Sequence, residues 1–238
     1  MKVAGLVRTS TLDFPGHLAA VVFTAGCNLD CFFCHNRTLL GEDAPDLPLT
    51  EVIAFLEKRK GLLDGVVISG GEPTLQPDLA SFMFLLREMG YAVKLDTHGG
   101  YPGVMESLLK TTPRSPVDYI AMDIKAPWPR YPDFCDCGPE TAEGVQESLA
   151  ILARLAGPAG VTWEVRTTVV PQLSEDDLVG MAASIPPVPL YALQLYRRPT
   201  VCRLEDHFRV AAAAMTPAGL EAAAVRMREY QPNVVVRA

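Results

Sequence analysis

Apolar residues along this chain fall into short uninterrupted runs, which alternate with longer segments where they recur every three or four positions. The short runs are typical of buried strands in a parallel sheet, and the longer segments are typical of helices that bury one face. Strands that alternate with helices indicate βαβ units, so the pattern predicts the α/β fold class with six strand–helix units. The predicted strands cover residues 19–24, 65–69, 91–95, 118–123, 161–170 and 189–195, and the predicted helices cover residues 50–60, 77–89, 102–110, 140–155, 174–184 and 216–229.

Residues at the ends of the predicted helices support this assignment. Thr50, Ser174 and Thr216 stand where an N-cap side chain accepts a backbone hydrogen bond. Gly61 and Gly90 stand where glycine commonly ends a helix. In such sheets, ligands bind at the carboxyl ends of the strands, so residues that follow the strands are the ones to examine for chemistry.

Composition favours a single domain over residues 1–238. The chain is 49% hydrophobic, which is enough to bury a full core, and no break in composition marks a linker. Support is weakest over residues 200–238, where the segment 233–236, with three consecutive valines, predicts an extra edge strand. The formal charge of −7 argues against a broad nucleic-acid or anionic-membrane surface. With no signal-peptide core and no run of roughly 20 apolar residues, we expect a cytoplasmic protein without nucleic-acid or membrane partners.

Three cysteines follow the first predicted strand in a C-x3-C-x2-C pattern, Cys27, Cys31 and Cys34. Three thiolates on one loop bind three irons of a [4Fe-4S] cluster and leave the fourth iron open to a second molecule. The spacing differs from the C-x2-C-x2-C run of bacterial ferredoxins and from the paired C-x2-C halves of zinc sites. The alternatives are three unrelated buried thiols, or a zinc site that His35 or a distant ligand completes.

Two glycines and a glutamate, Gly70, Gly71 and Glu72, follow the next predicted strand. Glycines at this position allow the backbone to approach a ligand closely. Taken alone, a pair of glycines is equally typical of a simple turn at the end of a strand.

Together, these two segments resemble the radical S-adenosylmethionine (SAM) superfamily. The resemblance implies a partial (β/α)6 barrel of the TIM type in which the three cysteines hold a [4Fe-4S] cluster. The open iron of that cluster would bind the amino and carboxylate groups of SAM. The resemblance also places Phe33, the aromatic residue before the third cysteine, near the adenine, and associates residues 70–72 with the methionyl ammonium.

Further candidates follow the third and fourth predicted strands, namely Asp96, Thr97, Asp123 and Lys125. The matching segments line the SAM pocket in the glycyl-radical activating enzymes, a group within this superfamily that the chain resembles. The resemblance therefore implies that these residues bind the cofactor, and that Asp96, Thr97 and Asp123 hold a monovalent cation near the SAM carboxylate. Oxygen ligands suit such a hard cation. The alternative is that the two aspartates only cap the helices or turns that follow.

Arg166 lies inside an otherwise apolar predicted strand, where an arginine needs an anionic partner. It matches a basic residue that reaches SAM in the same enzymes, so the resemblance implies a bidentate contact with the ligand carboxylate. A salt bridge to an acidic side chain across the barrel is the alternative.

Residues 13–16, 34–36 and 123–128 narrow the resemblance to activating proteins of anaerobic ribonucleoside-triphosphate reductase. The implied reaction is reductive cleavage of SAM to methionine and a 5′-deoxyadenosyl radical, which removes hydrogen from a glycine of a partner glycyl-radical enzyme. Reduced flavodoxin or ferredoxin is the expected electron donor. No catalytic residue is expected beyond the cluster ligands and the SAM contacts, since the cofactor supplies the chemistry.

The chain departs from this resemblance at two places. His98 stands where many of these activating enzymes have asparagine, and Cys135 and Cys137 form an added pair. We expect these two cysteines and Cys202 to be ordinary thiols, because a second cluster normally needs four ligands. Two other functions stay open: a radical SAM enzyme for a small molecule, similar to 7-carboxy-7-deazaguanine synthase, and a non-catalytic zinc- or cluster-binding module.

Overall fold

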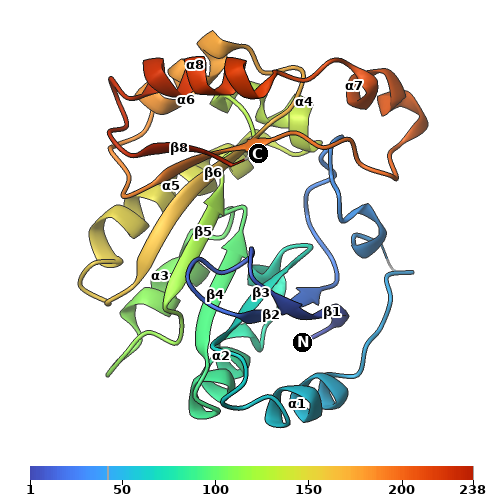
Figure 1. Ribbon diagram of the computed structural model, residues 1–238, viewed down its shortest axis with the longest axis vertical. Coiled ribbons are helices and arrows are strands. Elements are labelled where there is room, and N and C mark those ends of the chain that lie inside the picture. The colour runs from blue at the N-terminus through green and yellow to red at the C-terminus, as the bar shows by residue number, and fades with distance from the viewer. Residues whose placement is uncertain (42, 238) are drawn as a thin grey trace.

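A computed structural model describes residues 1–41 and 43–237 of the chain (Figure 1). Within these residues, one eight-stranded sheet has its strands in chain order, from β1 to β8. β1 is antiparallel to β2, and each later strand is parallel to the one before it. The strands are β1 (Val3–Ser10), β2 (Ala19–Thr24), β3 (Gly65–Gly70), β4 (Ala92–Thr97), β5 (Tyr119–Asp123), β6 (Thr162–Val169), β7 (Tyr191–Leu195) and β8 (Val234–Arg237).

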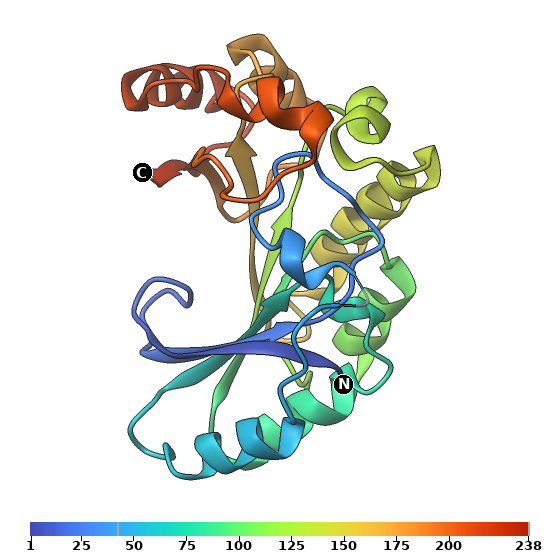
Figure 2. The same cartoon turned by 90° about the vertical axis from the view of Figure 1, so that its right-hand side faces the viewer.

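Helices connect the parallel strands and cover the outside of the curved sheet (Figures 1 and 2). Sequential parallel strands with right-handed connections put the intervening helices on the same face, which is the geometry of a barrel wall. β1 and β8 do not pair with each other in the part of the chain that is described, so the barrel is open. The α-helices are α1 (Leu49–Glu57), α2 (Leu79–Glu88), α3 (Pro102–Lys110), α4 (Tyr131–Cys135), α5 (Pro139–Leu155), α6 (Glu175–Ala183), α7 (His207–Ala211) and α8 (Pro217–Met227).

The predicted α/β partial barrel is confirmed, with the six predicted strands corresponding to β2–β7 and the apolar tail forming the edge strand β8. β1 was not predicted. Its residues run from buried to exposed, so it lacks the continuous apolar run of an interior strand. None of the helices in residues 1–41 and 43–237 is long and apolar enough to cross a membrane.

The predicted helix ends are confirmed in part. Ser174 and Thr216 are N-caps, and Ser174 forms a capping box. Gly90 follows α2 with a φ of +92°. Thr50 was wrong as a cap, because α1 begins one residue earlier, after Pro48. Gly61, at φ +73°, lies in the turn beyond α1 rather than at its end.

The end of the barrel opposite the carboxyl ends of the strands is filled by Phe14, from the connection between β1 and β2. Its buried ring packs against Val21, Val67 and Tyr119 on the inner face of the sheet. A side chain at Gly65 would collide with this ring and with the backbone of β4. Because Phe14 fills the end where the strands begin, the cavity of the barrel opens at the end where the strands finish.

Candidate active site

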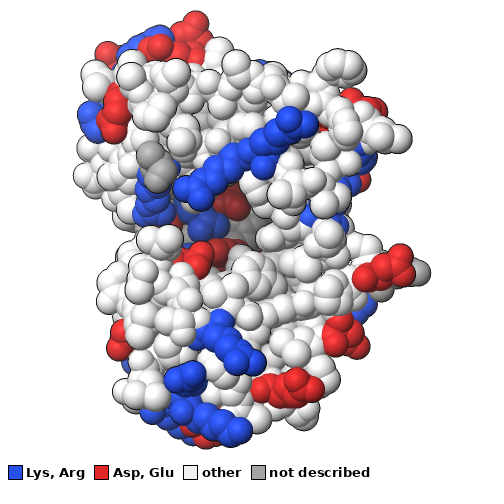
Figure 3. All heavy atoms as spheres, turned by 45° about the vertical axis from the view of Figure 1, so that its right-hand side comes forward, with Lys and Arg blue, Asp and Glu red and all other residues white. Residues whose placement is uncertain are grey.

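The loop that follows β2, residues 25–36, is here named the cysteine loop. It lies across the mouth of the barrel, where the parallel strands end. Cys27, Cys31 and Cys34 all line one cavity there, together with residues from the ends of β3, β4, β5 and β6. The cavity has about 780 Å³ of empty space, part of which is open to solvent. The surface is hollowed here, and acidic and basic side chains meet in the hollow (Figure 3).

Backbone hydrogen bonds to α4 hold the middle of the cysteine loop. The amide of Asp30 donates a hydrogen bond to the carbonyl of Cys135 at 2.9 Å. The amide of Phe32 donates one to the carbonyl of Phe134 at 3.2 Å. The ring of Phe32 is fully buried and meets that of Phe134 edge to face. Cys135, which was predicted to be an ordinary thiol, therefore lies against the cysteine loop and beside Cys31.

A segment distant in sequence also holds the loop. Arg203 forms ion pairs with Asp30, at 3.3 Å, and with Asp136, at 2.8 Å. The guanidinium of Arg209 stacks 3.8 Å from the ring centre of Phe32. Sequence reasoning did not find these two arginines, because nothing local distinguishes them from ordinary surface residues.

The donor set fits an iron–sulfur cluster better than a single metal ion. Among the described residues, no three His, Cys, Asp or Glu side chains converge as the ligands of one ion. A closed zinc site needs such convergence, and the described residues do not show it, although His35 lines the same cavity. In a [4Fe-4S] cluster each cysteine binds a different iron, so three sulfurs spaced around one cavity are the expected arrangement.

Protonation of the Cys27 and Cys34 thiols opposes metal binding. Burial raises the pKa of Cys27 to about 12 and also raises the pKa of Cys34. The pKa of Cys31 is lowered, because the Cys135 thiol donates a hydrogen bond to it. Since only thiolates bind iron, loading must release protons from this loop and should be favoured by higher pH.

The two glycines after β3 pack against the start of the cysteine loop. β2 and β3 pair in register as far as Thr24 and Gly70, so their carboxyl ends lie side by side. Gly70 has a φ of +117°, and a side chain there would collide with the backbone of Thr24. A side chain at Gly71 would collide with the backbone of Gly26. The close approach that the glycines allow in this structure is therefore to the cysteine loop, while both also line the cavity.

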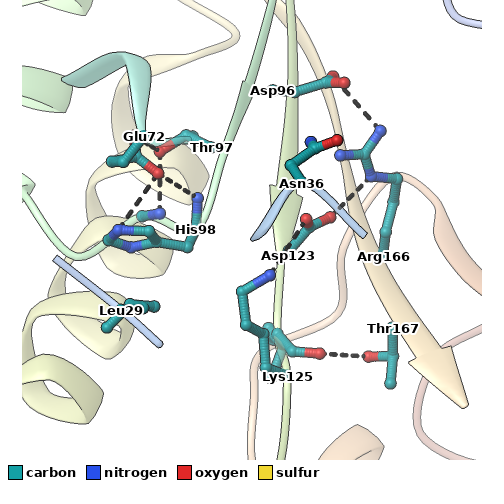
Figure 4. Close-up of polar contacts among 12 residues, drawn as sticks. Leu29, Asn36, Glu72, Asp96, Thr97, His98, Asp123, Lys125, Arg166 and Thr167 are labelled. Atoms are coloured by element: carbon teal, nitrogen blue, oxygen red, sulfur yellow. Dashed lines mark hydrogen bonds and ion pairs between the residues drawn. The ribbon is translucent and has the colours of Figure 1, made fainter. Parts of the chain in front are cut away.

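Glu72 is buried and receives hydrogen bonds on both carboxylate oxygens (Figure 4). Oε1 accepts from the Thr97 hydroxyl at 2.7 Å and from the amide and hydroxyl of Thr74. Oε2 accepts from the amide of His98 at 2.9 Å. We call Glu72, Thr97 and His98 the hydrogen-bonded wall. The predicted contact of Glu72 with the methionyl ammonium stays a prediction, because protein groups already satisfy this carboxylate.

Two acidic and two basic residues form the opposite side of the cavity, here named the charged wall: Asp96, Asp123, Lys125 and Arg166 (Figure 4). Arg166 Nε donates to Asp123 at 2.8 Å, and its Nη1 lies 3.3 Å from Asp96. Lys125 Nζ lies 3.5 Å from the other oxygen of Asp123. The salt-bridge alternative for Arg166 is therefore what the structure shows, and the contact with a ligand carboxylate stays a prediction.

Asp123, Lys125 and Arg166 remain ionised near neutral pH. Burial would raise the pKa of Asp123, but Arg166 and Lys125 outweigh it and lower that pKa to about 2. Burial likewise opposes the charge of Arg166 and of Lys125, yet Asp123 and its neighbours raise the pKa of both. Four side chains of alternating sign thus face the cavity together.

The expected cation site is not assembled in the described residues. Asp96 and Asp123 converge, but on the guanidinium of Arg166, and the hydroxyl of Thr97 turns to Glu72 instead. Neither aspartate is the N-cap of the helix that follows it, since those caps are Tyr101 and Pro127. The monovalent cation stays a prediction.

Lys94 is a buried charged residue of β4 that sequence reasoning missed. Its ammonium pairs with Asp96, and burial lowers its pKa although Asp96 opposes that shift. A lysine within the apolar run of a strand was the signal that could have identified it.

Phe33 is buried at the cavity, and its ring centre lies 4.9 Å from that of Phe32. The predicted position of Phe33 near the adenine stays a prediction.

Comparisons with known proteins agree with this geometry. The profile of the Radical SAM superfamily matches residues 21–185. The chain is 36% identical over 199 residues to a protein of Methanocaldococcus jannaschii whose name, glycyl-radical enzyme activating enzyme, is provisional; the match covers 82% of this chain and 79% of that protein. It is 37% identical over 130 residues to the pyruvate formate-lyase-activating enzyme of Clostridium pasteurianum, covering 52% of each. Streptococcus suis SuiB bound to S-adenosylmethionine has the same fold, with a TM-score of 0.62 at 14% identity over 90% of this chain and 48% of that one.

Proposed function

The chain belongs to the radical SAM superfamily, and from this membership we propose that it activates a glycyl-radical enzyme. Membership implies a [4Fe-4S] cluster and SAM. When bound, the cluster supplies the electron that cleaves SAM to methionine and a 5′-deoxyadenosyl radical. The observation that carries the proposal is that Cys27, Cys31 and Cys34 share one cavity with the charged wall, in a chain similar over 82% of its length to a provisionally named activating enzyme.

The charged wall suits the methionyl end of SAM, which carries an ammonium and a carboxylate. Arg166 and Lys125 present positive charge to the cavity, and Asp123 presents negative charge. A zwitterion can replace these internal ion pairs with equivalent ones, so binding leaves no buried charge without a partner. In this proposal the wall binds and orients SAM, and the protein around the cavity limits access of water.

A protein partner is supported by the surface beside the cysteine loop. Leu204 is 84% exposed and Phe208 is 91% exposed. Both belong to the segment whose Arg203 and Arg209 contact the cysteine loop. Large exposed apolar side chains next to a site are typical of a docking surface, and here the proposed occupant is the glycyl-radical enzyme.

The partner that we propose is anaerobic ribonucleoside-triphosphate reductase, because residues 13–16, 34–36 and 123–128 resemble the activating proteins of that enzyme. A pyruvate formate-lyase-like partner is the other class that the relatives suggest. Reduced flavodoxin or ferredoxin is the proposed electron donor.

Anaerobic reconstitution with iron and sulfide, followed by electron paramagnetic resonance, tests the proposal. We expect the reduced protein to give a [4Fe-4S]+ signal that changes on addition of SAM, and then a glycyl-radical signal when one of the two partner enzymes is added. Leu204→Ser with Phe208→Ser should reduce the partner signal while SAM cleavage is retained. Bound zinc without sulfide, or cleavage of SAM that modifies only a small molecule, would overturn the proposal.

A further inference from the structure

The imidazole of His98 connects three parts of the site that are far apart in sequence. Its Nε2 lies 3.0 Å from Oδ1 of Asn28 in the cysteine loop and 3.2 Å from Oε2 of Glu72. Its Nδ1 accepts a hydrogen bond of 3.0 Å from the amide of Gly100. The residue is only 4% exposed, so water does not substitute for these contacts.

These contacts determine which ring nitrogen carries the hydrogen. Both atoms next to Nε2 are oxygen acceptors, so Nε2 must donate, and Nδ1 must be unprotonated to accept from the Gly100 amide. A side chain on Gly100 would collide with the ring, so the glycine leaves the space that the ring needs. The ring is thus held in one orientation and one tautomer.

The residue that His98 contacts in the cysteine loop is next to a predicted cluster ligand. Asn28 directly follows Cys27, and Gly26 directly precedes it. The amide of Glu72 donates to the carbonyl of Gly26 at 2.8 Å, while His98 donates to the side chain of Asn28. Cys27 is therefore held on both sides by contacts from the ends of β3 and β4.

We propose that His98 is a positioning residue that fastens the cysteine loop to Glu72 and so fixes Cys27 for binding of the cluster. The inference rests on the proposed function for its role, but the fastening itself exists without metal. Asn28→Ala removes the same hydrogen bond between His98 and Asn28. Because Asn28 is exposed, this variant leaves the buried ring of His98 in place and does not disturb the core.

The test compares His98→Ala, His98→Gln, Asn28→Ala and the double variant His98→Ala/Asn28→Ala with the wild type, and uses His207→Ala, an exposed histidine, as the control. In the metal-free protein, the amides of residues 26–34 should exchange about tenfold faster in His98→Ala and in Asn28→Ala than in the wild type. This is the size of effect expected for the loss of one hydrogen bond. After anaerobic reconstitution, release of iron to a chelator should accelerate by a similar factor. The glutamine variant, which retains a donor, should remain near the wild type.

The double variant identifies a shared link. If His98 and Asn28 act through one hydrogen bond, the double variant should exchange no faster than His98→Ala alone. Effects that multiply, or alanine variants that match the wild type in exchange and iron release, would overturn the inference. A wild-type chain that takes up no cluster would overturn the proposed function instead, and the exchange measurement would still decide whether His98 fastens the loop.

Discussion

Glu72 and Asp123 are both carboxylates at the carboxyl ends of barrel strands, and they differ in what satisfies them. Glu72, on the hydrogen-bonded wall, receives hydrogen bonds from backbone amides and from hydroxyl groups. Asp123, on the charged wall, receives two cations and is 30% exposed at its side chain. The neutral groups that donate to Glu72 are part of the fold, so a ligand does not replace them. The ion pairs of Asp123 can be replaced by ion pairs with a charged ligand. The first wall therefore organises the backbone, and the second is suited to bind.

The largest effect should come from the cysteines, which both walls surround. Replacement of Cys27, Cys31 or Cys34 by alanine should abolish cluster binding and SAM cleavage, because one iron loses its only protein ligand. Iron and sulfide content together with the EPR signal measure this loss. Cys202→Ala is the matched control and should load normally; full SAM cleavage by any of the three variants would contradict the ligand assignment.

A change at Arg166 tests whether the charged wall binds the ligand. Arg166→Gln should weaken SAM binding by about 10–100-fold while cluster loading is retained, because the loss of a bidentate charged contact costs about 1.5–3 kcal/mol. Arg166→Lys should have a smaller effect, since it retains the charge without the fork geometry. Equilibrium binding of SAM to the reconstituted variants measures both, and wild-type affinity in the glutamine variant would remove this wall from the SAM site.

A change at Glu72 tests whether the hydrogen-bonded wall is structural. Glu72→Gln retains the shape but turns an amide donor toward the donors of Thr97 or His98, which leaves buried groups unsatisfied. The free energy of unfolding should fall by about 2–3 kcal/mol, seen as a lower urea midpoint. Glu229→Gln, at an exposed position, is the control. If stability were retained and only SAM binding lost, the distinction between the walls would be wrong.

Acid should weaken the charged wall through Asp123. Its pKa falls from an ordinary 3.8 to about 2, so its ion pairs stabilise the folded state above pH 3.8 and are lost as pH falls toward 2. The contribution is on the order of 2 kcal/mol. Unfolding free energy measured between pH 6 and pH 2 should show a shallower decline for Asp123→Asn than for the wild type. Equal slopes would mean that Asp123 is not held ionised by Arg166 and Lys125.

Much of the fold was predictable, because it depends on local apolar runs. Strands β2–β7 and the edge strand β8 follow from mostly apolar stretches, which charged residues interrupt in β4 and β6. The capping box at Ser174 involves residues only three positions apart. β1 was missed because an edge strand that is half exposed has no such run. The cap at Thr50 was wrong because α1 begins after Pro48.

The sequence by itself determined the cysteine spacing, the Gly-Gly-Glu segment and the apolar runs of the interior strands, because each of these involves neighbouring residues. Only the tertiary structure decided which partner each polar side chain takes. His98 and Asn28 are 70 positions apart in the sequence, and Arg166 and Asp123 are 43 positions apart. Arg203 and Asp30 are separated by 173 positions. The parallel sheet brings such residues together at one edge, and burial then requires each charged or polar group to find a partner there.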